Sequence, residues 1–132
     1  MTQEVDVGFV FRSATVGVGQ VVFVDTLAGS ILCLLAIATY TRMGAFGCLV
    51  GSLIATCIGL FVAPDAATAE YIASGRFSFN TALACLSFAN GVFIKLNTAM
   101  DFFVPLVGAI FTTMCQIVLR NMLPADLPVL AF

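Results

Sequence analysis

The stretch from Gly17 to Phe23 reads GVGQVVF and places two glycines and a glutamine inside an apolar segment. That segment runs from Ala14 to Val24, where Asp25 interrupts it. As a helix of about eleven residues, it would cover about half of a 30 Å hydrocarbon core. A half-length helix is tolerated in a bilayer only where its end is buried in protein or faces a water-filled cavity. The stretch therefore predicts a helix that ends at mid-depth in a membrane protein.

The composition of the whole chain agrees with a lipid environment. Of the 132 residues, 61% are apolar and 9% are charged, against roughly 45–50% apolar residues in soluble domains. The five basic residues are scattered singly and the net charge is −2, so a nucleic-acid-binding surface is not expected. We predict an integral membrane protein whose main surroundings are the lipid bilayer.

Further apolar runs follow the first segment, separated by charged or proline-containing stretches. The runs cover residues 26–41, 44–63, 78–94 and 102–119. Residues 1–12 are less apolar and are expected at or outside the membrane surface. The alternation of apolar and polar residues that a membrane barrel requires is missing. We therefore expect an all-α membrane fold with about four spanning helices plus one half-membrane helix.

Small residues recur every four positions in the second of these runs. They are Gly47, Gly51, Ala55 and Gly59. One stripe of the expected helix is thus almost bare backbone, which lets a neighbouring helix approach closely. We interpret the stripe as a packing surface.

The sequence offers no pattern typical of catalysis or metal binding. Its five cysteines lie inside apolar segments without C-x-x-C spacing, and the chain has no histidine. We interpret the cysteines as small packing residues rather than metal ligands. No nucleophile stands beside a base, and paired carboxylates and a phosphate-binding loop are also missing. The chain is predicted to be no enzyme and to need no cofactor.

Gln20 is the most unusual polar residue in the apolar segments. Its side chain supplies a carbonyl oxygen and an amide group, and Phe23, three residues later, is expected on the same helical face. A polar group beside an aromatic ring would suit a small, flat, neutral solute with hydrogen-bond donors. The alternative is that Gln20 only bonds a neighbouring helix, which is the common role of such residues.

A second unusual cluster, GRFSFN, covers residues 75–80 and opens the run at 78–94. Ser78 or Asn80 could cap the first turn of a helix, and Gly75 could provide the bend before it. Phe77 and Phe79 should point in different directions from the helix start, so at most one of them faces a cavity. A position at the membrane interface, with phenylalanines facing lipid, is the alternative for this cluster.

The order of four blocks of sequence resembles one half of the urea transporter family, and most closely its second half. The blocks are GVGQVVFVDTLAGSILCLLAIATY, GSLIATCIGL, GRFSFNTALACLSF and LPADLPVL, and the likeness covers roughly residues 11–131. The resemblance implies an inverted-repeat fold in which two homologous halves enclose one pore per subunit, and the subunits form trimers. Residues 13–132 would then be a single half repeat that lacks its last spanning helix.

The resemblance also implies roles for particular residues. Gln20 and Phe23 would line the pore, the amide as part of a polar ladder and the ring as one wall of an aromatic slot. Phe79 would be a further slot residue, and Asn80 would support it at the helix start. Ala131 stands where the family's closing motif has a threonine at the central constriction.

Two departures from the family pattern bear on function. Arg76, Phe77 and Ser78 precede Phe79 where the family usually has small or apolar residues, and Ala131 carries no hydroxyl. We expect passive, channel-type conduction of urea or a similar small neutral amide, through a pore that needs a second half or another copy. The alternative is a non-transporting structural subunit of a larger membrane protein complex, and the two departures are the features that support it.

Overall fold

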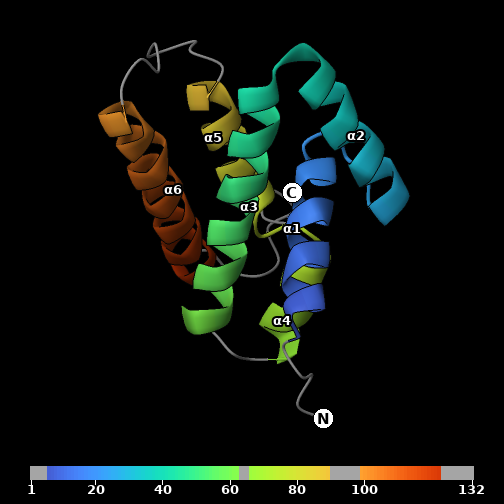
Figure 1. Cartoon of the computed structure of the whole chain (residues 1–132). Coiled ribbons are helices and arrows are strands. Elements are labelled where there is room, and N and C mark those ends of the chain that lie inside the picture. Colours follow the sequence, from blue (N-terminus) through green and yellow to red (C-terminus); the bar gives the residue numbers. More distant parts are fainter. Residues whose placement is uncertain (1–5, 63–65, 90–98, 123–132) are drawn as a thin grey trace.

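The structure is a computed structural model that describes residues 6–62, 66–89 and 99–122. Within these ranges the regular secondary structure is entirely helical (Figure 1). The elements are α1 (Val7–Gln20), α2 (Leu27–Tyr40), α3 (Arg42–Val62), α4 (Ala66–Ala73), α5 (Phe79–Ala89), the short 3-10 helix η1 (Ala99–Phe102) and α6 (Phe103–Met122).

Two of these helices have the length and composition to cross a membrane. They are α3, with 21 residues, and α6, with 20. The prediction of about four spanning helices is too high for the described residues, because α2 has 14 residues and α5 has 11. The apolar run at residues 26–41 matches α2 to within one residue at each end. The count was too high because this run is itself shorter than the about 20 residues that span a bilayer.

Helix α1 differs from the expected half-length segment at both ends. It begins at Val7 and ends at Gln20, whereas the apolar segment runs from Ala14 to Val24. With 14 residues and about 1.5 Å per residue, it covers about two thirds of a 30 Å hydrocarbon core. Part of the N-terminal segment that was expected at the surface is therefore helical.

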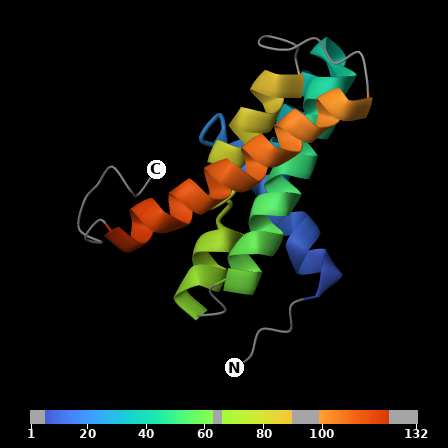
Figure 2. The same ribbon diagram turned by 90° about the vertical axis from the view of Figure 1, so that its left-hand side faces the viewer.

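Helix α3 is the centre of the bundle and contacts α1, α2, α4, α5 and α6. In Figure 1 it stands between α6 on one side and α1 and α2 on the other. Helix α6 crosses the bundle at a tilt (Figure 2). Because every other long helix packs on α3, positions along α3 serve as a depth scale for the rest of the fold.

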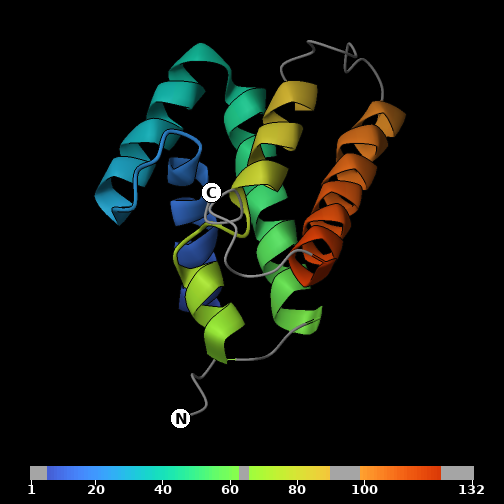
Figure 3. The same ribbon diagram turned by 180° about the vertical axis from the view of Figure 1, so that it is seen from behind.

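Two pairs of short helices, α4 with α5 and α1 with α2, are each joined by a turn that lies near the middle of α3. Helices α4 and α5 lie one beyond the other along α3 and are joined by the turn at residues 74–78 (Figure 3). The chain also turns back after α1, so that the first turn of α2 lies beside the last turn of α1, where Ser30 contacts Gly19. The fold therefore brings helix ends together inside the bundle, near the middle of α3.

The stripe of small residues on α3 faces α5 and the turn that precedes it. A Cβ atom on Gly51 would lie 2.6 Å from the Cys85 sulfur, and one on Gly47 would lie 2.7 Å from the Ala89 Cβ. A Cβ atom on Gly59 would lie 2.7 Å from the Phe77 ring. Real Cβ atoms do not approach this closely, so the missing side chains set the distance between α3 and α5.

Side chains are distributed as in a membrane protein. Large apolar residues such as Phe61, Phe103 and Phe111 are exposed on the outside. Among the residues that the structure describes, the buried polar ones are nearly all small and hydroxylated, with Gln20 as the one large member: Ser13, Ser30, Ser52, Thr56, Ser78, Thr81, Thr113 and Gln20. Small residues between helices and apolar residues outside are what packing in lipid favours.

Candidate functional site

The two unusual clusters of the sequence meet in the structure. The Nε2 atom of Gln20 donates a hydrogen bond to the carbonyl oxygen of Ser74, at 3.1 Å, across 54 positions of the chain. Gly75 lies directly on the backbone of α1, so a Cβ atom there would be 2.7 Å from the nitrogen of Gly17. We call this meeting point the junction: residues 17–25 with residues 74–78. The sequence indicated each cluster separately but not their contact.

Glycines make the close approach at the junction possible. Gly75 has a φ of +74°, in the left-handed region that favours glycine. A Cβ atom on Gly17 would overlap the hydroxyl oxygen of Ser78 and would lie 2.5 Å from that of Ser52. The backbone of α1 is therefore in direct contact with both α3 and the turn before α5.

Hydroxyl groups fasten α1 and the turn at this depth. Ser52, in the middle of α3, donates from Oγ to the carbonyl oxygen of Ala14 at 2.6 Å. Ser78 donates from Oγ to the carbonyl oxygen of Gly75 at 3.3 Å. These bonds satisfy polar groups that are buried away from water, as burial requires.

Gln20 is the last residue of α1 and is only 9% exposed. Besides its bond to Ser74, its Nε2 atom donates to the Oδ1 atom of Asp25. Within the described ranges both hydrogen bonds of the side chain are made by Nε2, and Oε1 makes none. The nitrogen thus ties together parts of the chain, as the helix-bonding alternative predicts, while the oxygen stays available to another partner.

Asp25 is a member of the junction that the sequence analysis missed, because it was read only as the end of an apolar run. Its carboxylate is exposed in the single chain and accepts from Gln20. An ionisable residue within an apolar stretch is rare and is a functional indicator in membrane proteins. Its position five residues after the unusual glutamine was the signal that could have revealed it.

Phe23 does not lie on the same helical face as Gln20, so that expectation was wrong. Helix α1 ends at Gln20, and the chain closes with Val24 N–H donating to Gly19 and Phe23 N–H donating to Gln20, both at 3.0 Å. This pattern is a Schellman motif, whose turn residue takes a left-handed conformation. That residue is Phe23, with a φ of 59° and a side chain that is 74% exposed.

The phenylalanines of the second cluster have different surroundings. Phe77 is 2% exposed and packs with Ala55 and Ile72 in the core. Phe79 and Asn80 are the first two residues of α5, and both are half-buried. Their roles in an aromatic slot stay predictions.

The two departures from the family pattern differ in what the structure says of them. The side chain of Arg76 is exposed, and its carbonyl oxygen accepts from Nε2 of Gln116 on α6 at 3.3 Å. The turn at residues 74–78 is therefore held from both sides, by α1 and by α6. Ala131 lies outside the described residues.

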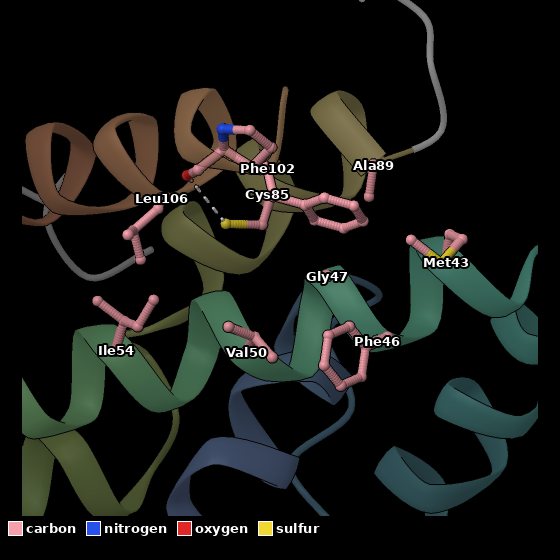
Figure 4. A pocket seen from close by; sticks show the side chains of 10 residues that line it. Met43, Phe46, Gly47, Val50, Ile54, Cys85, Ala89, Phe102 and Leu106 are labelled. Atoms are coloured by element: carbon pink, nitrogen blue, oxygen red, sulfur yellow. Dashed lines mark hydrogen bonds between the residues drawn. The ribbon is translucent and has the colours of Figure 1, made fainter. Parts of the chain in front are cut away.

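An apolar cavity of about 260 Å³ lies apart from the junction, between α3, α5 and the start of α6 (Figure 4). Its lining residues are Met43, Phe46, Gly47, Val50, Ile54, Cys85, Ala89, Phe102, Pro105 and Leu106. A small polar solute such as urea would lose its hydrogen bonds to water there without replacement. The junction, with its amide and hydroxyl groups, is the better candidate for a polar solute.

The described residues do not bring metal-binding side chains together. No group of three or more histidine, cysteine, aspartate or glutamate residues is close enough to hold an ion in residues 6–62, 66–89 and 99–122. The cysteines are all free, and Cys48 and Cys85 are buried among the packed helices.

Helices that end inside an apolar bundle, around a buried amide and hydroxyl groups, are typical of helical membrane proteins of the transporter or channel class. The family model described as Urea transporter matches residues 1–132. The chain therefore belongs to the urea transporter family, and the resemblance seen in the sequence is confirmed. It is a urea-transporter-like membrane protein, in a family of passive transporters rather than enzymes. A comparison with curated proteins finds no match.

Proposed function

We propose that the chain forms one part of a channel-type pore that conducts urea, or a similar small neutral amide, down its gradient. The observation that carries the proposal is the Gln20 side chain, which is held at a helix end inside the bundle with its oxygen free of hydrogen bonds to the described chain. The NH₂ groups of urea are donors that such an oxygen can accept. Conduction of this kind needs no cofactor, because pore width and the lining acceptors select the solute.

The pore would be completed by a second half or by another copy of the chain, as in an inverted repeat. Phe23 and Asp25 follow Gln20 in the turn after α1, and both are exposed in the single chain. A carboxylate at this depth is costly in contact with lipid, so a second body of protein or a water-filled path is expected to cover it. The family resemblance supports oligomeric assembly in the same way.

Further lining residues follow from the same matching to the family. Phe23 and Phe79 would be walls of an aromatic slot for a planar solute, and Asn80 would support Phe79. Ala131 would stand at the central constriction without the hydroxyl of the family's threonine. The slot would then select by shape while Gln20 selects by hydrogen bonding.

A structural subunit of a larger membrane complex is the second candidate. The exposed side chain of Arg76, within the junction, favours it, because a bulky cation at the mouth of a slot can obstruct a neutral solute. This candidate predicts a folded, membrane-inserted chain that does not raise urea permeability.

Urea flux into proteoliposomes tests the proposal directly. Wild-type protein is expected to raise urea permeability above that of protein-free vesicles, and Gln20→Leu is expected to remove the increase. Thr39→Val is the control, because it removes an exposed hydroxyl at the far end of α2, away from the junction, and it should keep the flux. Flux at the protein-free level for a folded wild-type chain, alone and with a second half, would favour the structural subunit.

A further inference from the structure

We propose that Asp25 is a positioning residue that fixes the orientation of the Gln20 side-chain amide, so that the oxygen and not the NH₂ group is presented to the solute. The orientation itself is a statement about this chain. Its consequence for solute selection rests on the proposed function.

The geometry places two acceptors around one nitrogen. The Nε2 atom of Gln20 donates to Oδ1 of Asp25 and to the carbonyl oxygen of Ser74. A glutamine amide nitrogen carries two hydrogens, so both are used. The hydrogen-bonding group that remains on Gln20 is the oxygen.

The opposite orientation of the amide would be unfavourable at both contacts. A half-turn of the amide would set Oε1 against a carboxylate oxygen and a peptide oxygen, and neither of these can donate a hydrogen bond. Ser74 alone would bias the orientation through one neutral bond. The carboxylate of Asp25 adds the stronger, charge-assisted bond, so it is the main determinant.

The surrounding backbone fixes the position of Asp25. The Schellman turn at Phe23 and Val24 reverses the chain directly before Asp25. Thr26 follows as the N-cap of α2 and accepts from the N–H of Gly29 at 3.3 Å. Asp25 therefore stands at the N-terminus of α2, where the helix dipole favours a negative charge. A charged Asp25 cannot act as a donor to Oε1, which keeps the amide in one orientation.

Solute selection follows from this arrangement. An amide that is free to turn could present either its NH₂ group, which donates hydrogen bonds, or its oxygen, which accepts them, and would therefore bind both kinds of solute. An amide held by Asp25 offers an acceptor only, so it favours solutes that carry N–H donors over solutes that carry acceptors alone. Asp25 would thus act through Gln20 without contacting the solute itself.

The test reads the amide directly, by ¹⁵N–¹H NMR of glutamine-labelled protein in lipid. The chain has three glutamines, Gln3, Gln20 and Gln116, and the signal lost in Gln20→Leu identifies the Gln20 NH₂ group. In the wild type its hydrogens should be slow to exchange with solvent. Asp25→Asn has the same shape but can also donate, so it should shift the signal and speed the exchange, whereas Asp25→Glu should restore slow exchange. Asp6→Asn makes the same change at the exposed N-cap, at the opposite end of α1 from Gln20, and should leave the signal unaltered.

Urea flux in the same variants separates this proposal from the proposed function. If wild-type protein conducts urea, Asp25→Asn is expected to slow it about five-fold, the equivalent of one ordinary hydrogen bond. An unchanged Gln20 signal in Asp25→Asn would overturn the positioning role, whatever the flux. A changed signal with an unchanged wild-type-level flux would support the orientation and overturn its effect on selection. A changed signal without urea flux in any variant would support the orientation while the proposed function fails.

Discussion

Replacement of Gly75 by alanine is the most direct test of the junction. Gly75 has a φ of +74°, and a Cβ atom there would lie 2.7 Å from Gly17 N, 2.7 Å from Val16 C and 2.9 Å from Gly17 Cα. All three are backbone atoms of a helix, so no side chain can rotate to make room. The turn at residues 74–78 would have to move away from α1, and the bond between Ser74 and Gln20 would lengthen.

The size of the effect can be worked from two contributions. A left-handed conformation costs a residue with a Cβ atom about 1–2 kcal/mol, and overpacking costs about 1–3 kcal/mol. The smaller conformational freedom of alanine in the unfolded chain offsets up to about 1 kcal/mol. We therefore expect Gly75→Ala to lower the free energy of unfolding by about 1–5 kcal/mol, a large share of the roughly 5–15 kcal/mol of a typical domain.

The assay is equilibrium unfolding in detergent micelles, followed by far-ultraviolet circular dichroism because the chain has no tryptophan. Gly8→Ala is the matched control, since Gly8 is an exposed residue of α1 whose Cβ atom would meet only Asp6, at 3.9 Å. That change should be neutral or stabilise the helix by up to about 1 kcal/mol. If Gly75→Ala came within 0.5 kcal/mol of Gly8→Ala, a difference well below the roughly 1–2 kcal/mol conformational cost, the close packing of the turn on α1 would be refuted.

Two further substitutions test the packing of α3 and the turn after α1. Gly51→Val should destabilise the protein by about 1–3 kcal/mol, because its Cβ atom would lie 2.6 Å from the Cys85 sulfur and 2.9 Å from the Thr81 carbonyl oxygen. An unfolding free energy equal to that of the wild type would contradict the α3–α5 contact. Phe23→Gly should stabilise the fold by about 0.5–1 kcal/mol, since it removes a left-handed phenylalanine at the cost of a more flexible unfolded chain, while urea flux falls if the ring lines the pore. A loss of stability on this change would contradict this reasoning, because it would show that packing of the Phe23 ring stabilises the fold by more than its left-handed backbone conformation costs.

The long helices were predictable because their cause is local. The apolar runs at residues 44–63 and 102–119 lie close to the helices Arg42–Val62 and Phe103–Met122. A long apolar run in lipid must satisfy its backbone hydrogen bonds internally, and a helix is the way to do so. The run at residues 26–41 predicted α2 (Leu27–Tyr40) equally closely, whereas α1 begins at Val7, before the apolar segment that starts at Ala14.

The candidate site was predictable in part. Gln20 stood out because a large polar side chain is rare in an apolar segment. The predicted direction of the Phe23 side chain was wrong because α1 ends in a Schellman turn before Phe23. Glycine usually marks the left-handed position of such a turn, and here that position is held by phenylalanine. Asp25 was missed because its role depends on its hydrogen bond with Gln20. That contact forms only because the chain reverses direction after α1.

The sequence by itself determined that this is a helical membrane protein of the urea transporter family, with a glutamine inside a short apolar segment. These properties follow from composition, the length of apolar runs and the order of sequence blocks, all of which are read along the chain. Only the tertiary structure decided that the clusters around Gly17 and Gly75 lie in contact and that both hydrogens of Gln20 are used. The reason is physical: hydrophobicity is a property of each residue, whereas the bond between Gln20 and Ser74 joins positions 54 residues apart. That bond depends on the close packing of the chain around Gly17 and Gly75, where a side chain on either glycine would not fit.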